Sequence, residues 1–348
     1  MQDFFLDSLV FGAKSVFVFL LFVLTVFVSV WATVKAVKGG SGSGGKDIEN
    51  GRISDDTELV NLTKEYAKIR SSVASKVLSK EENAKLAEQE KKKEKQRKAD
   101  QEGQERRHRL FVLDFDGDLN ASQAKNLGLQ IDALLSVVDP ADEVMVRVTS
   151  PGGTVTGYGL AASQLSRIRS RGIRLTVCVD KIAASGGYMM ACVADCIIAA
   201  PFAIVGSIGV VSEFPNFHRL LEKLDVDYEQ ETAGDFKRTL SIFGDNSDPR
   251  LREKFRQDLE TCHALFKSHI CKYRPQVKID EVATGEYWHA QDGIRHHLVD
   301  EIGTSNEFIA SKLDFADIFE FRCKKKTGLK GLLQTFSTAL YQAAHRML

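Results

Sequence analysis

The sequence lacks an excess of either charge. Its 47 Lys and Arg residues are balanced by 47 Asp and Glu residues, so the formal net charge at pH 7 is zero. A protein that binds nucleic acid through the phosphates needs a basic surface. The balance therefore gives no reason to expect a nucleic-acid partner, although the charges are unevenly spread along the chain.

The sequence also lacks the cysteine pattern of a metal site. None of its six cysteines belongs to a CxxC pair, and most of them lie among apolar residues. Cys192 and Cys196 are one helical turn apart, a spacing that a metal can use, but no histidine lies near them in the sequence to complete a site. We expect buried packing thiols and no bound metal.

Long uncharged runs are scarce, and one of them has the length of a membrane span. Residues 15–34 contain no charged residue, and a helix of about 20 apolar residues crosses the bilayer core. A cleaved signal peptide is the alternative, but the run is longer than the usual apolar region of a leader, and Asp3 and Asp7 are untypical of its basic start. We expect an uncleaved single-pass anchor within residues 1–38. More basic residues follow the span than precede it, which favours a cytoplasmic location for the rest of the chain.

Residues 39–108 are expected to link the anchor to a globular domain. They begin with a flexible glycine-serine spacer and continue into Lys- and Glu-rich sequence with the i,i+4 pairs of a solvated helix. A short coiled-coil seam is predicted by apolar residues at alternating steps of three and four, namely Leu59, Leu62, Tyr66, Ile69 and Val73. At the other end, residues 323–348 predict a basic amphipathic helix. It either lies on a membrane surface, contacts another subunit or packs against the domain.

Residues 109–322 have the pattern of one α/β domain. Short apolar runs alternate with amphipathic segments, in the order strand 110–115, helix 121–137, strand 144–149, helix 158–169 and strand 175–179. This order predicts a largely parallel sheet, whose chemistry lies in loops at the carboxyl ends of the strands. Residues 197–211 are apolar but are interrupted by proline and glycine, so they predict buried strands and turns.

Ser185 is the candidate nucleophile, because it lies between a predicted strand and an apolar helix that begins at Gly186. The first backbone N–H groups of a helix are unpaired and suit an oxyanion that develops beside a serine hydroxyl. Serine is also a favoured helix cap, so a structural role remains open. A glycine-rich turn, residues 149–154, follows another strand that should belong to the same sheet and faces the same cleft.

A serine nucleophile needs a base, and no histidine of the chain is an obvious one. A lysine can serve if burial lowers its pKa from about 10.4 toward 7. The sequence around Lys237 does not by itself distinguish this residue from an ordinary surface lysine.

Four motifs together resemble one known family. Residues 150–153 (SPGG), 184–188 (ASGGY), 206–210 (GSIGV) and 233–239 (AGDFKRT) occur in the order and spacing of the signal peptide peptidase A family of serine-lysine peptidases. Within that family they resemble the SohB branch. The resemblance extends over about residues 1–320, and it implies a core of the Clp protease and crotonase fold.

The resemblance implies a role for each motif. Ser185 would be the nucleophile, Lys237 the general base and Ser207 the hydroxyl that orients the lysine, while Gly153 and Gly186 would supply the oxyanion-hole N–H groups. It implies a homo-oligomeric, membrane-anchored endopeptidase without cofactor, acting on apolar peptides such as signal peptides or membrane-protein fragments. It also implies a bacterial inner-membrane location with a periplasmic catalytic domain, whereas the charges that flank the span favour the cytoplasmic side. An inactive membrane scaffold and a crotonase-like acyl-CoA enzyme are the alternatives.

Overall fold

The computed structural model describes residues 57–102 and 108–323. The predicted membrane span, the glycine-serine spacer and residues 324–348 of the predicted C-terminal helix lie outside these ranges. No helix within them is both long enough and apolar enough to cross a membrane.

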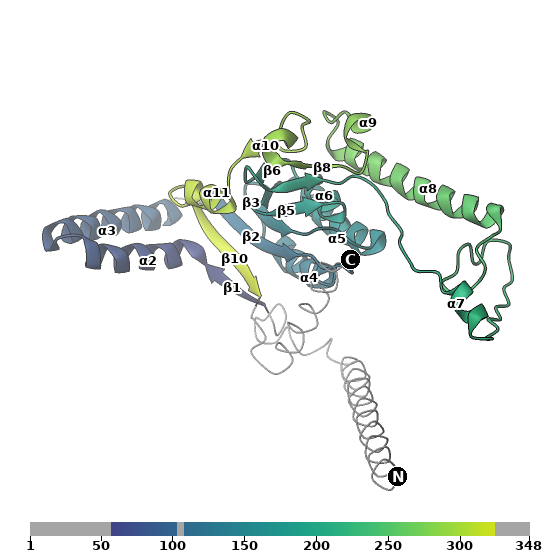
Figure 1. The fold of residues 1–348 in the computed structure, drawn as a ribbon. Coiled ribbons are helices and arrows are strands. Elements are labelled where there is room, and N and C mark those ends of the chain that lie inside the picture. The colour runs from purple at the N-terminus through teal and green to yellow at the C-terminus, as the bar shows by residue number, and fades with distance from the viewer. Residues whose placement is uncertain (1–56, 103–107, 324–348) are drawn as a thin grey trace, which may run out of the picture. The chain divides into compact units, whose positions relative to one another are not determined.

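The principal sheet has seven strands in the order β1-β10-β2-β3-β4-β6-β9 (Figure 1). Every neighbouring pair is parallel except β1 with β10. The strands are β1 (Thr57–Asn61), β2 (His108–Asp116), β3 (Glu143–Thr149), β4 (Arg174–Val179), β6 (Cys196–Ala199), β9 (Glu301–Ile302) and β10 (Ala316–Cys323). The predicted α/β class with a largely parallel sheet is therefore confirmed. Residues 57–61, which the sequence assigns to the linker, form an edge strand of this sheet.

A second sheet of three short strands was not expected. It has the order β5-β7-β8, with β5 (Ile182–Ala184) parallel to β7 (Ile204–Gly206) and β8 (Tyr287–His289) antiparallel to β7. Ser185 directly follows β5, so the prediction that its strand shares a sheet with residues 144–149 is wrong. A single bridge between Ser150 and Ala183 still joins the ends of β3 and β5.

Helices cover both faces of the principal sheet. The helices of the described residues are α2 (Leu62–Val77), α3 (Lys80–Glu102), α4 (Ala124–Leu135), α5 (Val155–Arg169), α6 (Gly186–Ala191), α7 (His218–Lys223), α8 (Pro249–Tyr273), α9 (Ile279–Val282), α10 (Ala290–Gly293) and α11 (Ser305–Lys312). Those in contact with the principal sheet include α2, α4, α5, α6 and α11. Alternate residues of the strands point to opposite faces. Leu110, Val112 and Met145 pack with Leu62 of α2 and Ile309 of α11 on one face, whereas Phe115 on the other face meets Tyr158 of α5 edge to face.

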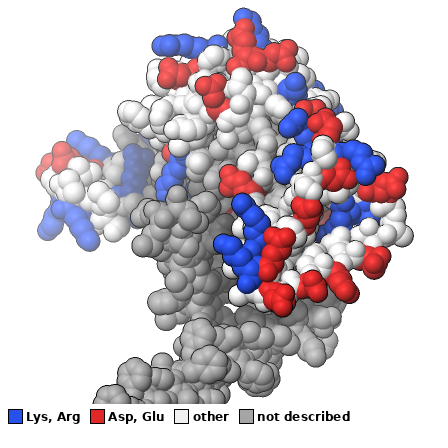
Figure 2. Space-filling model, turned by 45° about the vertical axis from the view of Figure 1, so that its right-hand side comes forward, with Lys and Arg blue, Asp and Glu red and all other residues white. Residues whose placement is uncertain are grey.

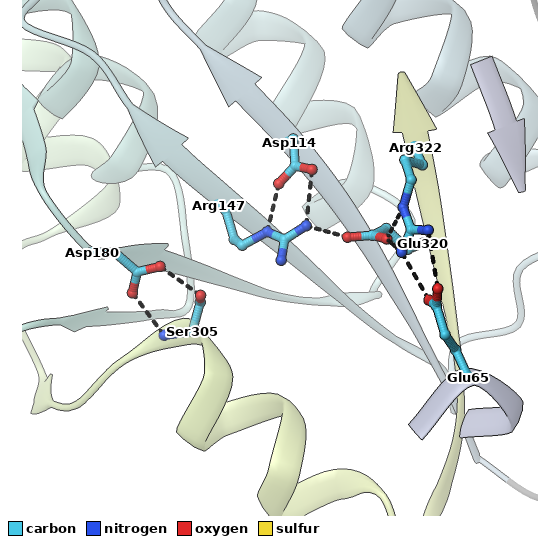
Figure 3. Close-up of polar contacts among 7 residues, drawn as sticks. All are labelled: Glu65, Asp114, Arg147, Asp180, Ser305, Glu320 and Arg322. Atoms are coloured by element: carbon cyan, nitrogen blue, oxygen red, sulfur yellow. Dashed lines mark hydrogen bonds and ion pairs between the residues drawn. The ribbon is translucent and has the colours of Figure 1, made fainter. Parts of the chain in front are cut away.

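The α2 and α11 face carries a chain of ion pairs where the apolar packing ends (Figure 3). The guanidinium of Arg147 on β3 binds both carboxylate oxygens of Asp114 on β2, at 2.5 and 2.9 Å, and also binds Glu320 on β10. Arg322 continues the chain from Glu320 to Glu65 of α2. Burial works to lower the pKa of Arg147, but hydrogen bonds and charge from Asp114 and Glu320 outweigh it and raise that pKa. The network ties four elements together across the sheet.

The helical hairpin formed by α2 and α3 departs from the coiled-coil prediction. Leu59 lies in β1, and of the predicted seam residues Leu62 and Tyr66 pack against the sheet. Ile69 and Val73 are more than half exposed. On the face drawn in Figure 2, basic and acidic side chains are interspersed with uncharged ones, and neither sign forms a continuous field.

Three of the cysteines confirm the expected packing role. The buried thiols are Cys178, Cys192 and Cys196, and burial raises the pKa of each. Cys271 is exposed and Cys262 half-buried, so for Cys271 the packing role is wrong. Both lie on α8, a helix with one face exposed to solvent.

Candidate active site

Ser185 has a strained backbone at the junction of β5 and α6. Its φ of 51° and ψ of −117° lie outside the regions that L-residues readily occupy. Hydrogen bonds hold it on both sides: its N–H donates to the Gly206 carbonyl at 2.7 Å, and its carbonyl accepts from Met189 N–H at 2.9 Å. Its hydroxyl makes no capping hydrogen bond. The cap alternative is therefore wrong, and the hydroxyl is left free of any hydrogen bond within residues 57–102 and 108–323.

The glycine-rich turn after β3 lies directly against Ser185. A Cβ atom on Gly152 would come within 2.7 Å of Ser185 Cβ and 2.9 Å of Gly186 N, and Gly152 has a φ of +97°. No side chain fits between the two segments. Ser150 holds the turn in place, since its N–H donates to the Ile182 carbonyl and its own carbonyl accepts from Ala184 N–H. The bridge to β5 thus brings Gly153 and Gly186 to one end of the two sheets.

The N–H groups of Gly153 and Gly186 have no acceptor within the part of the chain that the structure describes. Gly152 differs, because its N–H donates to Ser150 Oγ at 3.1 Å. Gly153 is half-buried and Gly186 is buried. Gly186 is the first residue of α6, where a helix leaves its N–H groups unpaired. Unpaired N–H groups beside a serine can stabilise an oxyanion.

Ser207 is a neighbour of Ser185 by strand register. Ala184 pairs with Gly206 in the parallel β5 and β7 strands, so the residue that follows each strand lies beside the other. Ser207 also has a positive φ, 51°, and its N–H donates to the Glu286 carbonyl at 2.7 Å. The register therefore makes two of the three predicted catalytic residues neighbours along the backbone.

Lys237 belongs to the segment between β7 and α8 that carries α7, and Figure 1 draws α7 away from β5 and α6. Lys237 is exposed, and its N–H closes a turn onto the Gly234 carbonyl at 3.1 Å. Within the described ranges, no hydrogen bond joins its amine to Ser185 or Ser207. The segment exposes many apolar side chains, among them Val211, Phe217, Leu220, Leu224, Val226, Tyr228, Phe236, Ile242 and Phe243.

Comparison with known proteins identifies the family. The profile described as Peptidase family S49 matches residues 167–318, and the profile described as Peptidase family S49 N-terminal matches residues 5–165. A protein named Probable protease SohB from Haemophilus influenzae is 48% identical over 251 residues, which cover 72% of this chain and 70% of that protein. The chain belongs to peptidase family S49.

Other relatives agree with this S49 assignment. Probable protease SohB from Buchnera aphidicola (subsp. Acyrthosiphon pisum) is 54% identical over 206 residues, or 59% of this chain and 61% of that protein, which is under two thirds of its length. Serine protease SPPA, chloroplastic, from Arabidopsis thaliana is 28% identical over 50% of this chain and 26% of its own length. The resemblance to the signal peptide peptidase A family and its SohB branch is confirmed.

The two S49 profiles divide the site between them. The Peptidase family S49 profile includes Ser185, Ser207 and Lys237, whereas the N-terminal profile includes Gly153. The profiles meet within α5, the helix that follows the glycine-rich turn. The described residues hold no cluster of His, Cys, Asp and Glu side chains that could bind a metal ion.

The structure adds to this S49 site a buried hydroxyl pair that joins Ser150 of the SPGG motif to Tyr158, a residue outside the four motifs. The hydroxyls of Ser150 and Tyr158, both fully buried, are 2.5 Å apart beneath the glycine-rich turn. Burial raises the pKa of the Tyr158 hydroxyl, which therefore stays protonated. The SPGG motif marked Ser150 as part of the turn but gave its hydroxyl no role, and Tyr158, an aromatic residue on the apolar side of a helix, is an ordinary core feature whose pattern carried no functional signal.

Helix α8 supplies two imidazoles that hold the backbone of the same site. His263 Nε2 lies 3.2 Å from the Ile208 carbonyl, next to Ser207, and His269 Nε2 lies 3.0 Å from the Met189 carbonyl in α6. Burial lowers the pKa of His269, so its neutral ring donates through Nε2–H. Neither histidine contacts the Ser185 hydroxyl, in keeping with the absence of an obvious histidine base.

Proposed function

We propose that this S49 peptidase is a serine endopeptidase in which Ser185 is the nucleophile. The observation that carries the proposal is the strained Ser185 backbone, held by Gly206 and Met189, with a hydroxyl that makes no cap. Strain of this kind costs about 1–3 kcal/mol and persists where the surroundings enforce it, commonly at active sites. A serine with only a capping role would have no need of it.

In this proposal the N–H groups of Gly153 and Gly186 form the oxyanion hole. Their lack of an intramolecular acceptor and their position on either side of Ser185 support this role. When the Ser185 hydroxyl attacks a peptide carbonyl, the carbonyl oxygen becomes an anion between the two donors. Fixed donors aimed at developing charge are commonly the largest single contribution to such a reaction.

Lys237 is proposed as the general base and Ser207 as its orienting hydroxyl. The neutral amine takes the proton of Ser185 Oγ while Oγ bonds to the peptide carbon. The resulting ammonium gives that proton to the leaving amine as the C–N bond breaks, which leaves an acyl-enzyme. Water attacks the ester next and loses its proton to Lys237, and the proton then passes to Ser185 Oγ as the acyl–oxygen bond breaks. Each half-reaction returns the lysine to its neutral form, and no cofactor enters the balance.

The exposed position of Lys237 means that the segment 211–248 has to lie against Ser185 in the active enzyme. The many apolar side chains on this segment support a homo-oligomer in which it is covered, because exposed apolar patches commonly mark interfaces. Removal of water from the lysine in such an interface would favour its neutral form. Assembly is thus proposed to complete the dyad.

Anchoring and substrate class follow from the sequence and belong to the same proposal. Residues 15–34 are proposed to span the bacterial inner membrane once, with the catalytic domain on the periplasmic side. Apolar peptides, such as signal peptides or membrane-protein fragments, are the proposed substrates. Cysteine labelling of α3 in intact cells tests the side of the membrane: labelling only after the inner membrane is permeabilised would contradict the periplasmic location.

Active-site labelling tests the chemistry. A fluorophosphonate probe should label Ser185 in the full chain, and an apolar internally quenched peptide should be cleaved. Both Ser185→Ala and Lys237→Ala should abolish cleavage, while Lys223→Ala, a change in α7 of the same segment, should preserve it. Mixing the two inactive variants then tells which chain supplies the base, since recovery of activity requires Ser185 and Lys237 from different chains.

An inactive membrane scaffold is the second candidate, and the separation of Lys237 from Ser185 is the observation that favours it. A scaffold predicts no probe adduct on Ser185 and no cleavage at any protein concentration. Membership in a peptidase family gives the acyl-CoA alternative no support.

A further inference from the structure

A chain of hydrogen bonds runs beneath the glycine-rich turn, and its direction follows from the chemistry of its members. Tyr158 OH is 2.8 Å from the Asp118 carbonyl, which can only accept, so the single phenolic proton is donated there. Ser150 Oγ, 2.5 Å away, must then donate its own proton to the Tyr158 oxygen. The Ser150 oxygen keeps its lone pairs for Gly152 N–H at 3.1 Å. We call this chain of hydrogen bonds, from Gly152 N–H through Ser150 and Tyr158 to the Asp118 carbonyl, the relay. Each of its protons has a single acceptor.

The same two residues also contact the other side of the Ser185 site. A Cβ on Gly186 would come within 2.3 Å of Tyr158 Cγ, so the phenol ring lies directly beneath the first residue of α6. A Cβ on Gly187 would come within 2.6 Å of the Ser150 carbonyl oxygen. One rigid, fully buried pair therefore supports both backbone segments that flank Ser185.

We propose that Ser150 and Tyr158 are positioning residues for the oxyanion hole. The relay occupies Gly152 N–H and fixes the turn, so that Gly153 N–H is the donor left free, and the Tyr158 ring sets the height of Gly186 N–H relative to it. This inference rests on the proposed function, since it assigns the pair a role in peptide hydrolysis through Ser185. Neither residue touches the substrate.

The Tyr158→Phe variant tests the proposal, because it deletes one oxygen and keeps the ring. Loss of the relay lets the turn shift, and a misplaced donor weakens stabilisation of the transition state rather than of bound substrate. We expect kcat on the quenched peptide to fall about 10- to 100-fold with KM changed less than twofold, short of the ~10²–10³-fold cost of removing a donor outright. Fluorophosphonate labelling of Ser185 should slow by a similar factor.

Thr176→Val is the control. Thr176 is fully buried like Tyr158, and its hydroxyl donates to Glu143 Oε1 at 3.0 Å, at the opposite end of β3 from the glycine-rich turn. The Thr176→Val variant should lose thermal stability while its kcat stays within twofold of the parent. Ser150→Ala should resemble Tyr158→Phe, and the double variant should be no slower than the slower single variant, because the two hydroxyls act as one relay.

The outcomes separate this inference from the proposed function. If the parent chain cleaves the peptide and Ser185→Ala does not, the function stands. In that case, equal kcat for Tyr158→Phe and Thr176→Val, or an effect confined to KM, overturns the positioning role. If the parent neither cleaves nor labels, the function fails and the assignment to catalysis fails with it. Hydrogen exchange then decides whether the relay holds the turn: faster exchange at residues 152–153 in Tyr158→Phe than in Thr176→Val supports it, and equal exchange refutes it.

Discussion

Replacing Gly152 by alanine should destabilise the fold through two separable effects. The first is backbone strain, because Gly152 has a φ of +97° and an L-residue held in such a region costs about 1–3 kcal/mol. The second is steric, because the new methyl would lie 2.7 Å from Ser185 Cβ and 2.9 Å from both the Ala184 carbonyl oxygen and Gly186 N. Overpacking of this kind costs about 1–3 kcal/mol. We expect the free energy of unfolding to fall by about 2–6 kcal/mol in total.

Two other glycines serve as controls, one for backbone strain and one for alanine at an unstrained position. Gly172 has a φ of +73° and nothing within 4 Å of a Cβ position, so Gly172→Ala should show the strain term alone, about 1–3 kcal/mol. Gly159 lies inside α5 with open space around its Cβ position, so Gly159→Ala should stabilise by about 0.5–1 kcal/mol.

Urea unfolding of the full chain, followed by fluorescence and circular dichroism, measures all three variants. Gly152→Ala should also reduce fluorophosphonate labelling of Ser185, since the methyl pushes against the serine itself, while Gly172→Ala should leave labelling unchanged. A Gly152→Ala chain that is no less stable than Gly172→Ala would refute the close packing of the turn on Ser185. Unchanged labelling would show that the turn does not position the nucleophile.

Two further predictions concern titration and charge. Burial lowers the pKa of His269 below its usual 6.5, so the folded state binds that proton less readily than the unfolded state, and this contribution to stability is complete above about pH 6.5 and is lost as pH falls toward the folded pKa. His269→Gln keeps a donor for the Met189 carbonyl without titrating, so its urea stability should gain on the parent between pH 7 and 5; a constant difference would contradict the assignment. Arg147→Met should lower the free energy of unfolding by about 1.5–3 kcal/mol, because it leaves buried Glu320 with fewer charged partners. Arg250→Met removes a solvent-exposed pair and should leave the free energy of unfolding nearly unchanged. Equal losses in urea unfolding would show that the sheet network is not stabilising.

The sequence predicted those parts of the fold that depend on local pattern. Apolar alternation and helical spacing predicted the order of β2, α4, β3, α5 and β4, and the structure confirms each of these elements. Small residues after an apolar run placed Ser185 at the start of a helix for the same reason. The three-residue strands β5 and β7 are too short to show a period, so the second sheet was missed. Only the three-dimensional register reveals that Ser185 and Ser207 are neighbours.

The position of Lys237 is the part of the site that local sequence does not predict. Family motifs single it out, but nothing in its local sequence determines where the segment 211–248 lies. Its turn is closed by a single contact with Gly234, and the surrounding apolar side chains are exposed in one chain. Under the proposed assembly, contacts with another copy of the chain would determine where this segment lies, and a local sequence pattern does not encode such contacts.

The two halves of the candidate site therefore differ in how they are built. Ser185, Gly153 and Gly186 are held by backbone hydrogen bonds and by glycine contacts too close for any side chain, so their geometry is already present within one described domain. The proposed base lies on an exposed segment. A serine hydroxyl is a weak nucleophile unless a base accepts its proton. Ser185 with its oxyanion donors but without a neutral amine nearby should therefore attack amides poorly. If assembly delivers Lys237, an isolated chain has a formed site but little peptidase activity, which keeps hydrolysis confined to the assembled enzyme.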